Sequence, residues 1–99
     1  MEDKTKVIFR KFKDGDIIAL FPEILASEDL SKCMSYQYIG QHGPASLDII
    51  HETKLATPEE YQDLKTELES IGYTLQVIYK STYRMYRMRL EHLMIWKCT

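Results

Sequence analysis

The chain has 99 residues, of which 44% are hydrophobic and 28% charged, with a net charge of −2. These values are typical of one ordinary globular domain and exclude collagen-like, intrinsically disordered and disulfide-rich proteins. No apolar run reaches the roughly 18 residues of a membrane span, and the first residues lack the apolar stretch of a signal peptide. We therefore expect a single domain over residues 1–99 in the cytoplasm, with Cys33 and Cys98 as reduced thiols.

The charge is unevenly distributed along the chain. Residues 1–75 carry 8 basic and 14 acidic side chains, a net charge of −6, whereas residues 76–99 carry 5 basic and 1 acidic, a net charge of +4. A basic segment on an acidic domain can contact nucleic acid or another anionic surface, or it can pack against the acidic part of its own chain.

The first predicted element is a β-hairpin. Segments 6–12 and 16–21 are rich in β-branched and aromatic residues and flank Lys13-Asp14-Gly15. An Asp-Gly pair suits a type I′ turn, so the sequence predicts Asp14-Gly15 as a two-residue loop with Phe12 facing Ile17. Both faces of this hairpin are apolar, which indicates that both need cover.

Residues 33–39 alternate between apolar and polar side chains and predict a third strand. The glycines and the proline of residues 40–44 are expected to end this strand. Residues 46–51 predict a further short strand. A helix is then predicted over about residues 58–71. Thr57 is its N-cap, Pro58 occupies its first position and Glu60 completes a capping box. Gly72 supplies the left-handed stop, and residues 73–79 predict the last strand, reached through this crossover helix.

A C-terminal helix is predicted over about residues 82–97, within a basic and apolar segment that covers residues 80–99. It is apolar over most of its circumference, so it is either buried on several sides or offers a surface to a partner. The predicted fold class is α+β, a small mainly antiparallel sheet formed by the N-terminal hairpin, the third strand and the last strand, with two helices.

One loop is a candidate site. Gly40, Gln41, His42 and Gly43 could expose backbone N–H groups to an anion, with His42 as a base or ligand; the alternative is an ordinary strand end and turn. No motif typical of a nucleotide-binding, kinase or hydrolase site is present, and no cysteine or histidine spacing is typical of a metal site. We therefore expect that the protein is not an enzyme and that it has no catalytic residue, no metal and no cofactor.

The C-terminal helix is the other candidate, because its aromatic residues alternate with cations. Tyr and Arg are enriched at protein interfaces and Met packs adaptably there, while cations with aromatic rings also suit nucleic acids. The candidate binding residues are Tyr83, Arg84, Tyr86, Arg87, Met88, Arg89 and Trp96. We predict a small non-enzymatic protein that binds another protein or its own copy; the alternatives are a nucleic-acid-binding protein that uses Lys80, Arg84, Arg87 and Arg89, and a helix that only covers the sheet.

Four segments in order carry a resemblance: Lys6-Val7-Ile8-Phe9-Arg10-Lys11-Phe12, Ala19-Leu20-Phe21-Pro22-Glu23-Ile24, Ile39-Gly40-Gln41-His42-Gly43 and Ala56-Thr57-Pro58-Glu59-Glu60-Tyr61. In these, the chain resembles a group of small uncharacterised proteins from Bacteroidetes bacteria and their mobile elements. The resemblance covers about residues 4–79 and implies no activity, so it assigns no functional residue. The C-terminal helix departs from the group.

Overall fold

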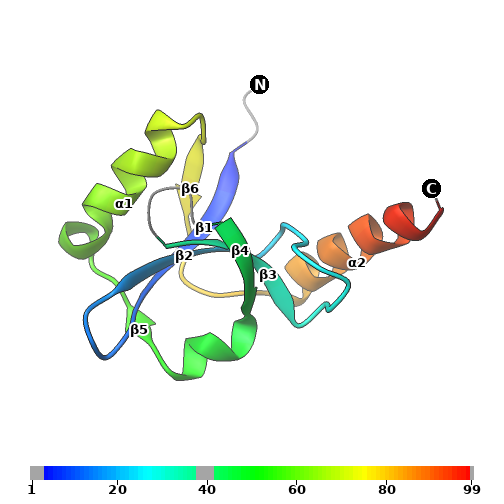
Figure 1. The fold of residues 1–99 in the computed structure, drawn as a ribbon, viewed down its shortest axis with the longest axis horizontal. Coiled ribbons are helices and arrows are strands. Elements are labelled where there is room, and N and C mark those ends of the chain that lie inside the picture. The colour runs from blue at the N-terminus through cyan, green and yellow to red at the C-terminus, as the bar shows by residue number, and fades with distance from the viewer. Residues whose placement is uncertain (1–3, 38–41, 99) are drawn as a thin grey trace.

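The computed structural model describes residues 4–37 and 42–98, with the backbone alone for residues 96–98. It confirms an α+β fold with a mainly antiparallel sheet and two α-helices (Figure 1). In chain order the elements are β1 (Thr5–Lys11), β2 (Ile17–Phe21), β3 (Lys32–Tyr36), β4 (His42–Ser46), the 3-10 helix η1 (Leu47–His51), β5 (Lys54–Leu55), α1 (Pro58–Ser70), β6 (Leu75–Val77) and α2 (Tyr83–Cys98).

The sheet is built around β1. Strands β4, β3, β2 and β1 follow one another as antiparallel neighbours, and the remaining edge of β1 is shared by two short strands. β5 pairs antiparallel with Arg10 and Lys11, whereas β6 runs parallel to residues 5–7. The predicted last strand is therefore confirmed, as the one parallel partner in the described sheet.

The hairpin is confirmed, but its predicted register is wrong by one residue. The Phe12 N–H donates to the Asp16 carbonyl at 2.9 Å, which closes a three-residue loop, and β1 pairs Lys11 with Ile17. Within this turn only Gly15 adopts a positive φ, of 97°, so the two positive angles of a type I′ turn are not met. Because side chains alternate along a strand, this shift places Phe9 on the same face as Ala19.

Both faces of the hairpin are covered, as its apolar pattern predicted. On one face Val7, Phe9 and Phe21 pack with Tyr61 and Leu68 of α1. The opposite face is mainly covered by η1 rather than by a second α-helix; its buried residues are Ile8, Ile18, Leu20 and Cys33, packed by Leu47, Ile49 and Ile50 among others.

α1 begins and ends as its sequence predicts. The Thr57 hydroxyl accepts from the Glu60 N–H, the Glu60 carboxylate accepts from the Thr57 N–H, and Pro58 is the first helical residue. At the other end Gly72 has φ of 113°, and the Tyr73 N–H donates to the Leu68 carbonyl at 3.2 Å. This is a Schellman-type end, and it turns the chain into β6.

The prediction of a strand over residues 46–51 is wrong. Ser46 accepts a hydrogen bond from the Asp48 N–H and starts η1 instead. The buried Arg10 guanidinium donates to Ile50 and Thr53, which satisfies carbonyls at the end of this helix. The predicted break at residues 40–44 is also wrong from residue 42 onward, because β4 begins there. β4 lies at the edge of the sheet, where the missing N–H of Pro44 is tolerated.

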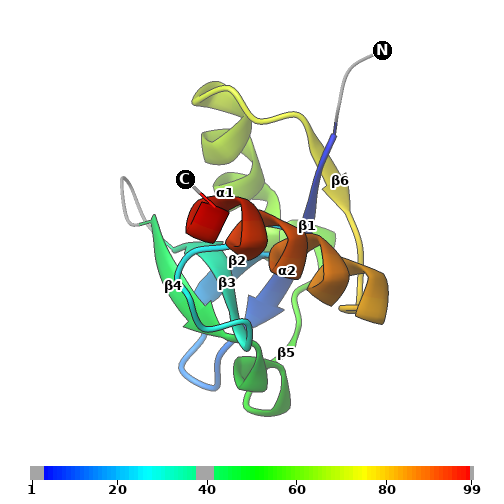
Figure 2. The same cartoon turned by 90° about the vertical axis from the view of Figure 1, so that its right-hand side faces the viewer.

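α2 confirms the predicted C-terminal helix. It lies across the segment between β2 and β3, on the other side of the molecule from α1 (Figures 1 and 2). Among the described side chains of α2, residues 83–95, three are buried, and they lie four residues apart on one stripe: Met85, Arg89 and Leu93. Much of its circumference therefore faces outward.

Candidate functional surface

The outward side of α2 concentrates exposed apolar side chains. Of the seven large hydrophobic side chains that are exposed in the described part of the chain, four belong to this helix, so the cluster is local rather than scattered. Tyr83 is 72% exposed and Met94 59%. We define the α2 surface as the exposed side chains of Tyr83, Arg84, Tyr86, Arg87, Met94 and Ile95.

Aromatic and cationic groups lie side by side on the α2 surface. The rings of Tyr83 and Tyr86 stack with their centroids 5.9 Å apart. Arg84 and Arg87 are exposed, and the ion pairs among the described residues do not include them. These guanidinium groups can therefore bind a carboxylate or phosphate without breaking an internal pair.

Arg89 points into the molecule instead of belonging to the α2 surface. It is 2% exposed, and its Nε and Nη2 atoms donate to the Leu30 carbonyl at 3.2 and 3.1 Å while Nη1 donates to the Pro22 carbonyl. Burial lowers the pKa of the Arg89 guanidinium. Its carbon Cζ lies 5.9 Å from the Tyr86 ring centroid, so Arg89 supports the α2 surface from behind.

The remaining two candidate binding residues on this helix are Met88 and Trp96. Met88 is half-buried at the border of the α2 surface. The side chain of Trp96 lies outside the described part of the structure. The structure thus brings together Tyr83, Arg84, Tyr86 and Arg87, and it separates Arg89 from them.

The glycine-flanked loop is only partly described, since Gly40 and Gln41 lie outside the described residues. His42 and Gly43 belong to β4. The His42 Nε2 atom lies 3.1 Å from the Tyr73 hydroxyl, and its ring meets the edge of Tyr36 at 4.6 Å between centroids. The described contacts of His42 are therefore those of a side chain that ties β4 to the segment between α1 and β6.

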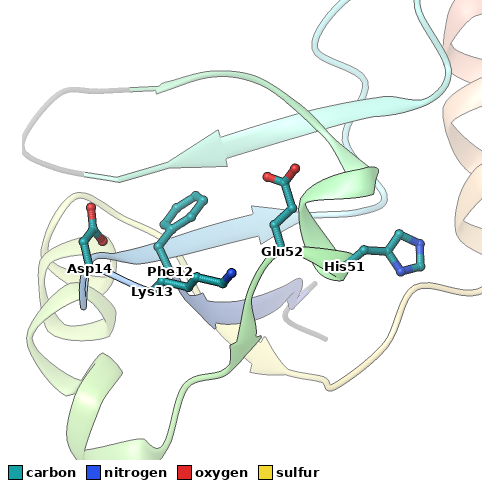
Figure 3. Close-up of a pocket in the computed structure, with 5 residues that line it drawn as sticks. All are labelled: Phe12, Lys13, Asp14, His51 and Glu52. Carbon is teal, nitrogen blue, oxygen red and sulfur yellow. The ribbon is translucent and has the colours of Figure 1, made fainter.

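An open pocket of about 510 Å³ lies between the β1–β2 turn and the end of η1. Figure 3 shows its lining residues: Phe12, Lys13, Asp14, His51 and Glu52. The imidazole of His51 and the carboxylate of Asp14 point away from each other, so these two groups do not converge on one point (Figure 3).

Cys33 is a buried free cysteine, and burial raises the pKa of its thiol to about 11. This thiol is held in its neutral, unreactive form near pH 7. Among the residues whose placement is described, no three His, Cys, Asp or Glu side chains form a group suited to a metal ion. None of the described helices combines the length and hydrophobicity needed to cross a membrane.

A second surface was missed by the sequence reasoning. A mostly apolar groove of about 520 Å³ lies between the end of β6 and the start of α2, with Val77, Ile78, Tyr79 and Met85 in its lining. Tyr79 and Lys80 mark its position in the sequence, but the groove exists only because the start of α2 brings Met85 next to the segment that follows β6. No spacing rule gives that placement.

No protein-family model, curated protein or solved structure matches this chain. The resemblance to small proteins of Bacteroidetes and their mobile elements stays a prediction.

Proposed function

We propose that the chain is a small non-enzymatic cytoplasmic protein that acts by binding another protein, a second copy included, through the α2 surface. The observation that carries this proposal is the cluster of exposed large hydrophobic side chains on one helix of an otherwise packed domain. Clustered apolar exposure of this kind is typical of interaction sites, whereas single exposed residues are ordinary.

The composition of the α2 surface also favours a protein partner. Tyr, Met and Arg are enriched at interface cores, and an arginine with no internal ion pair adds specificity there. Fully burying one large apolar side chain stabilises a complex by about 1.5–3 kcal/mol. Burial of Tyr83 and Met94 together is therefore enough to shift an association equilibrium by orders of magnitude.

Sedimentation velocity from micromolar to millimolar concentration tests self-association. We expect dimers for the wild-type chain and monomers for a folded variant with Tyr83→Ser and Met94→Ser. Ile71→Ser is the matched control, because Ile71 is also exposed but follows α1. It should dimerise as the wild type does.

A photo-crosslinking amino acid at position 83, compared with the same amino acid at position 71, tests binding to another protein in the host cell. Crosslinks to protein from position 83, and not from position 71, are expected. A chain that stays monomeric and gives no such crosslink would refute the proposal.

A nucleic-acid partner is the second candidate, favoured by the exposed Lys80, Arg84 and Arg87 beside the exposed rings of Tyr79 and Tyr83. The test is a titration with single- and double-stranded DNA and RNA at several salt concentrations. Binding whose log–log salt slope falls by about 2 on replacing Arg84 and Arg87 with Gln supports it. Absence of binding at low salt eliminates it.

A further inference from the structure

In the described part of the chain, β6 leaves one edge of the sheet unpaired. Its only strand partner among the described residues is β1, and Figure 2 shows it at the outer side of the sheet. The ladder to β1 uses alternate residues: the Thr74 carbonyl accepts from the Thr5 N–H at 2.7 Å, and the Ile78 N–H donates to the Val7 carbonyl at 2.8 Å. The N–H and C=O groups of Leu75 and Val77 therefore point away from β1.

The two ends of the sheet differ in how they are protected. β4, at the opposite end, carries Pro44, which has no N–H to offer an incoming strand. β6 contains no proline, and its Leu75-Gln76-Val77 sequence keeps every backbone donor. Of the two ends, β6 is the one equipped to accept another strand.

The groove beside this edge adds side-chain specificity. Tyr79 and Met85 are among its apolar lining, and Lys6 and Lys80 are its two cations. Lys6 already pairs with Glu23 at 3.4 Å, whereas the ion pairs of the described residues leave out Lys80. An occupant with an apolar side chain next to a carboxylate would match both the groove and Lys80.

We propose that β6 is a docking edge for an extended acidic segment of a partner protein, which adds a strand beside Leu75 and Val77. In this mode of recognition, backbone hydrogen bonds supply affinity and side-chain pockets supply specificity. An apolar side chain of the segment enters the groove against Tyr79 and Met85, and a carboxylate meets Lys80. This surface is separate from the α2 surface and does not depend on it.

A second copy of the chain fits this edge less well. An antiparallel β6–β6 pairing centred on Gln76 places Lys80 opposite Gly72 of the other copy. Residues 70–74 contain no acidic side chain, so the lysine would again lack a partner. Charge complementarity therefore favours a different, acidic segment.

The probe is a capped, fluorescent peptide of alternating Val and Thr with Glu at both ends, titrated into the full-length chain. We expect saturable binding, with amide NMR shifts and hydrogen-exchange protection at Leu75 and Val77. Val77→Pro removes an outward N–H without removing a ladder bond, so it should weaken binding about tenfold. Val77→Thr is the matched control, since it changes the side chain and keeps the N–H.

Two further measurements do not depend on the proline variant folding. A peptide with alternate N-methylated amides should lose binding, and Lys80→Glu should reverse the preference toward a peptide with Lys at both ends. Unshifted amides at residues 75 and 77, or equal affinity for the N-methylated peptide, would overturn the proposal, and so would dimerisation through this edge. The Tyr83→Ser, Met94→Ser variant should bind the peptide normally, which separates this inference from the α2 surface.

Discussion

Replacing Arg89 with Ala should destabilise the fold, although Arg89 lies in a sequence that resembles a solvent-exposed basic surface. The guanidinium is 2% exposed and donates to two backbone carbonyls, those of Pro22 and Leu30. Leaving a buried acceptor without a partner costs about 1–3 kcal/mol, and the lost packing of the side-chain stem adds to this. We expect a loss of about 3–5 kcal/mol, a large part of the ~5–15 kcal/mol that stabilises a typical domain.

Urea unfolding followed by circular dichroism measures this loss. At a typical slope of ~2 kcal/mol/M, the midpoint should fall by about 2 M. Arg87→Ala is the matched control on the same helix, and because Arg87 is exposed its free energy of unfolding should change by less than about 0.5 kcal/mol. Arg89→Lys should give an intermediate loss, since one ammonium group cannot reproduce the fork of donors. Equal midpoints for Arg89→Ala and Arg87→Ala would refute the reasoning.

Three other predictions follow from single residues. Lys11, which donates to the Glu60 carboxylate, lowers the pKa of that group from 4.5 to about 2. A carboxylate whose pKa is lower in the folded than in the unfolded state stabilises the fold above its unfolded-state pKa. This contribution to stability should therefore be full above about pH 4.5 and disappear toward pH 2. In Glu60→Gln, the unfolding midpoint should lose this part of its pH dependence. Iodoacetamide at pH 8 should leave the Cys33 peptide unmodified until urea unfolds the chain, as read by mass spectrometry. Gly72→Ala should cost about 1 kcal/mol or more in thermal or urea unfolding, because Gly72 has φ of 113°; an unchanged midpoint would contradict a left-handed end to α1.

The elements set by local chemistry were predictable. The capping box at Thr57 and the left-handed Gly72 bound α1 through contacts a few residues apart, and sequence spacing reports such contacts directly. The two-sided apolar hairpin correctly predicted cover on both faces. Its register was not predictable, because Asp-Gly suits both a two-residue loop and the last two positions of a three-residue loop.

Elements set by distant contacts were not predictable. η1 depends on the buried Arg10, which donates to carbonyls 40 and 43 residues away, and an apolar run with no such partner reads equally well as a strand. The same holds for Arg89, whose acceptors lie 59 and 67 residues away. One signal was present: Arg89 lies four residues from both Met85 and Leu93, on the stripe that is buried.

Arg89 also explains how a helix with apolar residues on most sides keeps one orientation. A purely hydrophobic contact is non-directional. Rotating α2 by one position would place the apolar Tyr86, Leu90 and Met94 where the buried stripe now lies. Hydrogen bonds from a planar guanidinium to two fixed carbonyls are directional, so they select one rotation of the helix. In that rotation Tyr83 and Met94 face outward. The buried arginine therefore specifies which side of α2 faces outward, and the proposed binding of a partner would use the side chains on that side.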